Sequence, residues 1–148
     1  DDTRHVEAVR RHVRREDLED RVEFLGAVGD DRLADVLRAS HVLAVPSRYE
    51  GFGIVYLEGM SFGLPALAST AGGATDVVTD GETGRLVQPD DPAAVARALE
   101  AFAGDETRLA RMGKAARRRY EAHPDWDETM ERVRDHLRTV TGTAEVSP

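Results

Sequence analysis

Residues 47–58 read SRYEGFGIVYLE and lie between a short apolar run and a helical pattern. The apolar run at 42–45, VLAV, predicts a buried strand, and residues 53–62 predict a helix. Gly51 and Gly53 allow the backbone to turn sharply between them and to approach a ligand closely. A strand, a glycine turn and a helix in this order lie at the carboxyl end of a parallel sheet, where open α/β folds bind their ligands.

The same alternation of short apolar runs and longer helical segments extends along the chain in both directions. It predicts a Rossmann-like α/β fold, in which helices flank a parallel sheet. Strands are expected at 22–25, 42–45, 66–68 and 85–87. Helices are expected at 3–15, 30–40, 53–62 and 74–78, from Asp91 onward, and in two segments after Asp105 that His123 and Pro124 separate. We expect one domain at 1–140 and a frayed tail at 141–148.

The first turn of the helix at 53–62 predicts an anion-binding site. The amides of Gly53, Ile54 and Val55 are expected to point out of the helix N-terminus, free of intrahelical partners. The partial positive charge at this end of a helix favours phosphate. The segment therefore predicts a phosphate cradle that does not use a P-loop, with an ordinary helix start as the structural alternative.

Two carboxylates flank this cradle. Glu58 lies four residues after Ile54, on the same face of the helix and one turn deeper. A carboxylate there repels phosphate but accepts hydrogen bonds from a diol such as ribose. Glu50, just before the turn, would face the other end of the same ligand. An acidic pair at this spacing arises by chance in a chain so rich in acids, but the combination with the glycine turn favours a nucleotide diphosphate that carries a sugar.

Composition excludes several classes of function. The 148 residues include no cysteine, which excludes disulfides, thiolate zinc sites and cysteine nucleophiles. The net charge of −8 argues against binding to nucleic acid, which requires a basic face. No apolar run approaches the roughly 18 residues of a membrane span, and the polar start does not resemble a signal peptide. We expect a cytoplasmic protein, with peripheral attachment at the inner face of a membrane left open.

Motifs of two other enzyme classes are missing. The serines are not accompanied by a histidine and a carboxylate at a recognisable spacing, and none occupies a nucleophile elbow. A Gly-x-Gly-x-x-Gly segment does not follow the first expected strand, which argues against a Rossmann dehydrogenase. Trp126, with Met130 and Val133 at helical spacing, is expected to pack in the core or against another domain.

The segment from Glu50 to Glu58 resembles the Glu-x7-Glu motif of the retaining GT-B glycosyltransferases of family 4, which include glycogen synthase and bacterial mannosyltransferases. The resemblance covers roughly residues 22–140, most of the C-terminal, nucleotide-sugar-binding domain of that fold. The supporting matches are Phe24-Leu25-Gly26, the run at 42–47, Gly63-Leu64-Pro65, Gly72-Gly73 with Asp76, Asp80-Gly81, Gly84 with Leu86 and Val87, and Trp126.

The resemblance implies a role for each matched residue. Glu50 would hold hydroxyls of the donor sugar, and Glu58 would bind the ribose hydroxyls. Val28 matches the position whose backbone touches the base. The backbone amides of the turn and first helical residues would face the sugar and distal phosphate, and these residues are Gly51, Phe52, Gly53, Ile54 and Val55. Members of the family use a nucleotide diphosphate sugar as donor and need no metal or other cofactor.

Other parts of the family pattern lie upstream of Asp1. They are the basic residues that clamp the diphosphate, the first strand with its glycine loop, and the N-terminal, acceptor-binding domain. Asp76 stands where the family commonly has glutamate. We therefore expect a donor-binding domain that is inactive alone and belongs to a hexosyltransferase. A non-catalytic nucleotide- or sugar-binding module and a GT-B sugar-nucleotide epimerase are the alternatives.

Overall fold

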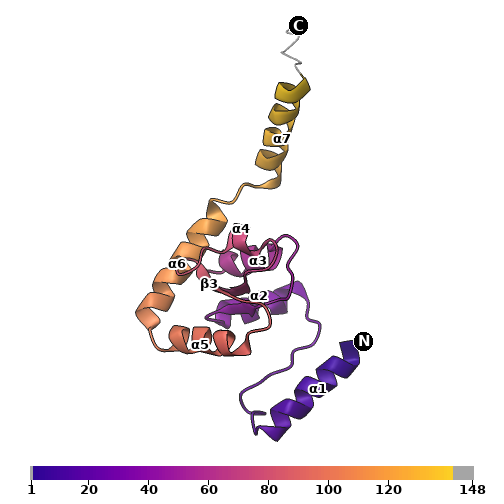
Figure 1. The fold of residues 1–148 in the computed structure, drawn as a ribbon, viewed down its shortest axis with the longest axis vertical. Helices are drawn as coiled ribbons and strands as arrows, with labels where there is room; N and C mark the ends of the chain where they lie inside the picture. Colours follow the sequence, from indigo (N-terminus) through magenta and orange to yellow (C-terminus); the bar gives the residue numbers. More distant parts are fainter. Residues whose placement is uncertain (1, 142–148) are drawn as a thin grey trace. The chain divides into compact units, whose positions relative to one another are not determined.

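The computed structural model describes residues 2–141. The chain forms two compact units, Asp1–Val36 and Leu37–Pro148. The expected tail at 142–148 lies outside the described residues. Seven helices and three strands are present within residues 2–141 (Figure 1). The boundary between the units falls inside α2, Asp30–Ala39, whose start and apolar stripe agree with the sequence pattern.

The first unit is built around α1, Asp2–Arg15. Val13 is its only buried residue among residues 3–36, and the expected apolar face adds the half-exposed Val6 and Val9. The guanidinium of Arg10 lies over the ring of Phe24, 4.8 Å from the ring centroid. This unit therefore holds few buried apolar side chains.

The expected strand at 22–25 is not formed, so the prediction of four strands is wrong for the described residues. Val22, Phe24 and Leu25 are each more than a third exposed instead. A strand needs a neighbour to satisfy its backbone groups. In the doubly wound order 3-2-1-4-5-6, the third strand pairs with the second and not with the fourth. The described residues before Val22 form only α1 and a turn, so this segment has no strand with which to pair.

The second unit contains the sheet, a parallel arrangement in the order β1-β2-β3. Its strands are β1 (Leu43–Val45), β2 (Ala66–Ser69) and β3 (Gly84–Val87). Ala44 pairs with Leu67, which in turn pairs with Arg85. All four residues of β2 are buried, as the central strand of a sheet covered on both faces requires. Three of the four expected strands are thus confirmed in place.

The helices of this unit also agree with the sequence pattern. They are α3 (Ile54–Ser61), α4 (Ala74–Val77), α5 (Pro92–Ala103), α6 (Glu106–Glu121) and α7 (Trp126–Thr141). The carboxylate of Asp91 caps α5 by accepting a hydrogen bond from the Ala94 amide at 2.8 Å, and Pro92 occupies the first turn. Gly63, with φ of 77°, ends α3 in a Schellman motif, in which the Leu64 amide donates to the Gly59 carbonyl.

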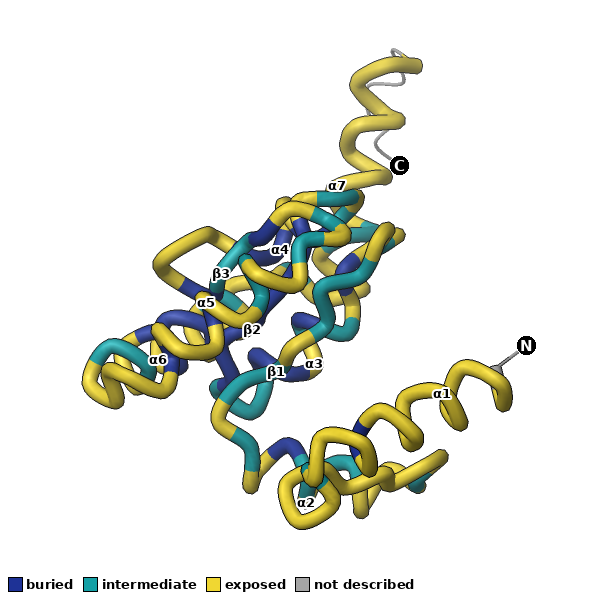
Figure 2. The backbone as a smooth tube through the Cα atoms, turned by 60° about the horizontal axis from the view of Figure 1, so that its bottom comes forward, coloured by how far each residue is buried: buried dark blue, intermediate teal, exposed yellow. Residues whose placement is uncertain are grey.

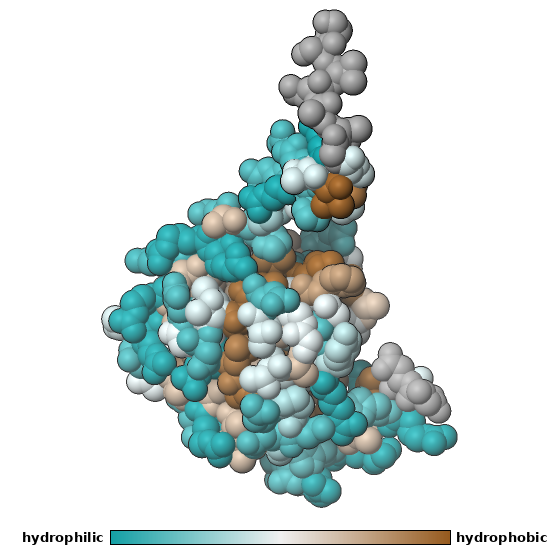
Figure 3. Space-filling view, turned by 45° about the horizontal axis from the view of Figure 1, so that its top comes forward, coloured by the Kyte–Doolittle hydropathy of each residue, from teal (hydrophilic) through white to brown (hydrophobic). Residues whose placement is uncertain are grey.

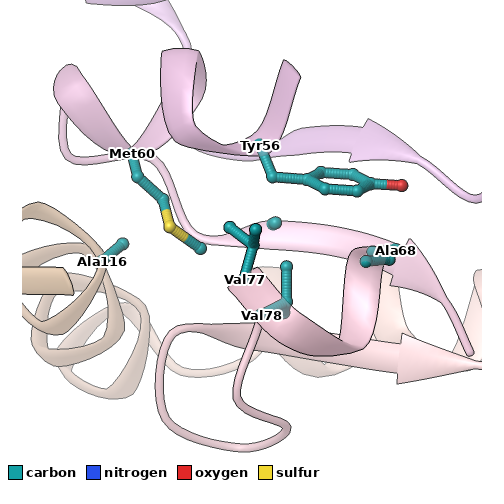
Figure 4. Close-up of a cluster of buried hydrophobic side chains, with 8 residues drawn as sticks. Tyr56, Met60, Ala68, Val77, Val78 and Ala116 are labelled. Atoms are coloured by element: carbon teal, nitrogen blue, oxygen red, sulfur yellow. The ribbon is translucent and has the colours of Figure 1, made fainter. Parts of the chain in front are cut away.

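The core lies on both faces of β2. Ala66 and Ala68 point to one face, where α3, α4 with the residue after it, and α6 contribute Tyr56, Met60, Val77, Val78 and Ala116 (Figure 4). Leu67 points to the other face and packs against Val87, Ala98, Phe102 and Met112. The small residues of β2 let α3 and α4 lie close to the sheet, whereas larger side chains fill the opposite face. Figure 2 shows that burial is concentrated at the strands and at the helix sides next to them.

Glycines set the distances between several elements. A Cβ on Gly113 of α6 would lie 2.6 Å from the carbonyl oxygen of Gly63, so the two backbones are in direct contact. A Cβ on Gly59 of α3 would lie 2.7 Å from Leu43 Cδ2 on β1. Helix α3 therefore sits tightly between the sheet and α6.

Helix α7 has no buried residue and departs from the sequence expectation. Trp126 is 74% exposed, so the prediction that it packs in the core is wrong, and packing against another domain stays a prediction. Asp125 caps the helix, because its carboxylate accepts from the Glu128 amide at 2.9 Å while the Glu128 carboxylate accepts from the Asp125 amide at 3.3 Å. On the face shown in Figure 3, hydrophilic side chains predominate. No helix within residues 2–141 combines the length and the apolarity of a membrane span.

Candidate ligand-binding site

The candidate site lies at the carboxyl edge of the sheet, in the second unit. Because β1, β2 and β3 are parallel, the loops that follow them, 46–53, 70–73 and 88–91, all leave the sheet on this edge. The segment SRYEGFGIVYLE comprises most of the first loop and the first five residues of α3. The position expected from the strand, turn and helix pattern is therefore confirmed.

The loops after β1 and β2 touch through backbone atoms. The Gly73 amide donates to the Glu50 carbonyl at 2.7 Å, and Glu50 and Gly72 form an isolated parallel bridge. Gly72 has φ of 70°, and a Cβ there would overlap the Glu50 carbonyl oxygen. A Cβ on Gly73 would lie 2.7 Å from the Gly51 carbonyl oxygen. Side chains at either position would thus separate the two loops.

Gly53 forms the N-cap of α3 in a left-handed conformation, with φ of 73° and ψ of 17°. Its carbonyl accepts from the Tyr56 amide at 3.0 Å, which starts the helix. The amides of Ile54 and Val55 have no hydrogen-bond partner among the described residues. Two first-turn donors are therefore available for an anion, as the sequence predicts.

The Gly53 amide differs from the expectation of a free donor. It donates to the Glu50 carboxylate, 3.2 Å from Oε1. Glu50 is half-buried, and its negative charge lies close to the positive end of the helix dipole. The arrangement therefore places a fixed carboxylate at the start of the turn and leaves the anion-binding donors one and two residues further along.

Tyr56 is fully buried and joins α3 to β1. Its hydroxyl donates to the Val45 carbonyl at 2.7 Å. Burial raises the pKa of the Tyr56 phenol above its usual value of 10.0, and the charge of Glu50 raises this pKa further. The neutral phenol is thus a structural hydrogen-bond donor that fixes the distance between the helix and the strand.

Glu58 lies one turn further into α3 and is exposed, so its carboxylate is accessible to a ligand. The Ser61 hydroxyl donates to the Glu58 carbonyl at 2.7 Å. This contact uses the backbone of Glu58 and does not involve its carboxylate. Glu50, the first-turn amides and Glu58 thus follow one another along a single loop and helix. Val28 belongs to the first unit, where it is half-buried in the segment before α2.

Large apolar side chains surround the glycine turn and face solvent. Phe52 is 82% exposed, Tyr49 76% and Ile54 68%. A Cβ on Gly51 would meet no heavy atom within 4 Å, so this part of the turn is open. Asp76 stands where the family that the sequence resembles commonly has glutamate. It is exposed, and its carbonyl accepts from Arg119 Nη2 at 2.8 Å.

One contact of the site could not be anticipated from the sequence. Arg48 Nε donates to Asp90 Oδ1 at 2.7 Å, which joins the loop after β1 to the loop after β3. The two residues are 42 positions apart, and neither belongs to a recognisable motif.

A cavity of about 630 Å³ lies at the opposite, amino edge of the sheet, between the end of α3 and one face of α6. Its lining includes His41, Phe62, Pro65 and Lys114 and none of the predicted site residues. Within residues 2–141, no group of three or more His, Asp or Glu side chains is placed to hold a metal ion.

The family model described as "Glycosyl transferases group 1" matches residues 3–119, which include the whole candidate site. The chain belongs to the group 1 glycosyltransferases.

Curated relatives of the chain include D-inositol 3-phosphate glycosyltransferases. That of Streptomyces avermitilis is 48% identical over 110 residues, which make up 74% of this chain and 24% of the relative. That of Rhodococcus opacus is 38% identical over 135 residues, or 86% of this chain and 30% of the relative. The chain thus spans about a quarter of the length of the curated relatives it matches.

Solved glycosyltransferase structures share the fold. Sucrose-phosphate synthase from Thermosynechococcus elongatus matches with a TM-score of 0.79 and 34% identity, over 95% of this chain and 35% of that chain. Anabaena HepE in complex with UDP matches with a TM-score of 0.83 and 27% identity, over 93% of this chain and 37% of that chain. HepE has also been solved with UDP-glucose. The expected Rossmann-like α/β fold of GT-B glycosyltransferases is confirmed.

Proposed function

We propose that the chain is the donor-binding domain of a retaining glycosyltransferase of family 4. The whole protein would transfer a hexose from a nucleotide diphosphate sugar to a hydroxyl acceptor. The observation that carries the proposal is the order of the groups along the loop and α3 at the carboxyl edge. The carboxylate of Glu50, held by the Gly53 amide, is followed by the amides of Ile54 and Val55, which have no partner among the described residues, and then by Glu58. HepE, which shares the fold, has been solved with UDP and UDP-glucose, and this supports a donor of that class.

The order of the groups matches the order of parts in such a donor. Glu50 accepts hydrogen bonds from the sugar, because its position at the Gly53 amide excludes a phosphate there by charge repulsion. The amides of Ile54 and Val55 receive the distal phosphate, together with the backbone of Gly51 and Phe52. Glu58 binds the ribose hydroxyls.

Catalysis in this arrangement comes from positioning and from stabilisation of the leaving group. When the bond to the sugar breaks, negative charge grows on the diphosphate, and the first-turn amides of α3 together with the helix dipole stabilise it. Glu50 keeps the sugar oriented while the acceptor approaches. The proposed site uses no metal ion.

The remaining parts of the site belong to chain outside these 148 residues. Within residues 2–141 the sheet has no counterpart of the first and second strands of the doubly wound order. The proposed whole protein supplies these strands, the basic clamp and an N-terminal acceptor domain, and acts in the cytoplasm. The isolated chain then binds the donor weakly and does not transfer the sugar.

Saturation-transfer NMR with UDP, GDP and ADP and their glucose conjugates tests the proposal on the chain itself. We expect transfer to one nucleotide and its sugar conjugate. Glu58→Ala removes the ribose contacts and should weaken nucleotide binding by about 1–3 kcal/mol. Glu100→Ala, which removes an exposed carboxylate from α5, is the matched control and should have no effect.

Glu50→Gln separates the sugar role from the nucleotide role. This change removes the charge but keeps an oxygen that can accept from the Gly53 amide. It should lower the affinity for the sugar conjugate more than the affinity for the bare nucleotide. An equal loss for both ligands, or unchanged binding in Glu58→Ala, would contradict the assignment.

A further inference from the structure

The Arg48–Asp90 ion pair joins the first and third loops at the carboxyl edge. Arg48 lies two residues before Glu50, and Asp90 lies in the connection between β3 and α5. The side chains are 83% and 62% exposed, although Nε and Oδ1 are only 2.7 Å apart. A pair so exposed adds little to the free energy of folding, because solvent screens it. The role of this ion pair is therefore to be found in the loops that it joins and not in its contribution to stability.

Asp90 holds this contact in an unfavourable backbone conformation. Its φ is 59°, a left-handed value that aspartate and asparagine reach more readily than other residues with a Cβ, but that glycine adopts with less strain. The next residue, Asp91, caps α5, so Asp90 is fixed to the start of a helix. Aspartate at this position gives up stability that glycine would retain, and the contact it gains is the one with Arg48. Strain of this kind is a reason to look for a functional role.

The loop that carries Glu50 is consequently held from two sides. On one side the Gly73 amide donates to the Glu50 carbonyl at 2.7 Å. On the other side Arg48 is tied to the start of α5 through Asp90. Glu58, by contrast, stands on α3, which packs against the sheet and α6 and does not depend on this loop. Loss of the ion pair would thus disturb Glu50 and leave Glu58 in place.

We propose that Asp90, acting through Arg48, is a positioning residue for Glu50 and so sets the preference for a sugar-bearing nucleotide over the bare nucleotide. The inference rests on the proposed function of Glu50 as the group that binds the donor sugar. Neither Arg48 nor Asp90 needs to touch the ligand. Their effect appears as a difference between two ligands of the same site.

Asp90→Gly separates positioning from stability, because it removes the strain and the ion pair together. We expect a higher urea midpoint of unfolding, an unchanged affinity for UDP, and a ratio of UDP-glucose to UDP affinity that falls about two- to fivefold. A purely structural role would move stability and binding in the same direction. Asp90→Asn is the matched control, since asparagine tolerates a positive φ and can still accept from Arg48, and it should largely restore the ratio.

Arg48→Ala and the double variant complete a cycle. Arg48→Ala should lower the ratio as much as Asp90→Gly does, and the double variant should lower it no further, because either change breaks the same contact. Additive losses, or an unchanged ratio in Asp90→Gly while Glu50→Gln lowers it, would overturn the positioning role and leave the proposed function standing.

Amide exchange tests the same contact without ligand. The Gly73 amide, which bonds to the Glu50 carbonyl, reports the position of the loop. It should exchange faster in Asp90→Gly even though that variant is more stable, and an unchanged or slower rate overturns the inference. If the wild-type chain bound none of UDP, GDP, ADP and their glucose conjugates, the proposed function would fail for this chain, and the exchange rate would still decide whether the ion pair holds the loop.

Discussion

Gly72 lies where two loops of the candidate site meet, and its replacement tests how closely they pack. Gly72→Ala adds a Cβ that overlaps the Glu50 carbonyl oxygen at a φ of 70°. Gly81→Ala is the matched control, because Gly81 has φ of 77° but no heavy atom within 4 Å of its Cβ position. The control should cost about 1–2 kcal/mol of unfolding free energy for the left-handed backbone alone. Gly72→Ala should cost roughly 1–3 kcal/mol more through overpacking.

Urea unfolding of the two variants measures this difference. If both lost the same free energy, the loop that carries Glu50 would have room to move away from Gly72. The contact between the loops would then not fix the position of the carboxylate.

Tyr56 makes folding stability sensitive to alkaline pH. The folded state raises the pKa of its phenol above 10.0, so between the unfolded and folded pKa values the folded chain binds more protons. The contribution of Tyr56 to the free energy of unfolding is therefore fully present below about pH 10 and is lost as the pH rises above that value. Tyr56→Phe removes this dependence but leaves the Val45 carbonyl without its donor, at a cost of about 1–3 kcal/mol near neutral pH.

Urea midpoints of both proteins between pH 7 and pH 11 check this prediction. The two curves should approach each other above about pH 10. Parallel curves over the whole range would show that the phenol ionises equally well in the folded and unfolded chains.

The residues of the site were more predictable by type than by contact. The glycine turn and the two carboxylates of residues 50 and 58 stand in a local pattern, and the structure places them at the expected edge. The hydrogen bond from the Gly53 amide to Glu50 could not be predicted, because it depends on the side-chain rotamer of Glu50. The Arg48–Asp90 contact needs the register of the whole sheet, which a single sequence does not specify.

At the scale of elements, local sequence signals predicted the helices correctly, whereas one predicted strand is not formed within residues 2–141. Asp91 with Pro92, and Gly63 after α3, mark helix ends through local backbone chemistry that operates wherever the segment lies. A strand instead requires a partner, and the apolar residues at 22–25 have none within residues 2–141. Trp126 was misplaced for a related reason, since periodicity shows which face of α7 is apolar but not what covers it.

Gly113 tests the contact between α3 and α6. Helix propensity alone predicts that Gly113→Ala stabilises α6 by about 1 kcal/mol. The structure predicts the opposite sign, because the new Cβ would lie 2.6 Å from the Gly63 carbonyl oxygen, a backbone atom that cannot rotate away. We expect a net loss of roughly 1–3 kcal/mol in urea unfolding. A gain in stability would mean that α6 can shift away from the end of α3 without cost.

At the scale of the whole molecule, stability is concentrated in the second unit. Val13 is the one buried residue within 3–36, whereas β2 is buried along its whole length. Helix α7 likewise has no buried residue. Regions with few buried apolar contacts open at low free energy, even when they are regular helices. The described chain therefore combines a stable centre with two helices of low local stability.

Hydrogen exchange followed by mass spectrometry tests this distribution. Helices α1, α6 and α7 have 14, 16 and 16 residues, so length and propensity alone predict similar protection. Because α6 buries Met112, Ala115 and Ala116 against the core, its amides should exchange only through global unfolding, as should those of β2. The amides of α1 and α7 should exchange orders of magnitude faster and respond little to urea. Equal protection in the three helices would show that α1 and α7 are stabilised by contacts beyond the burial described for residues 2–141.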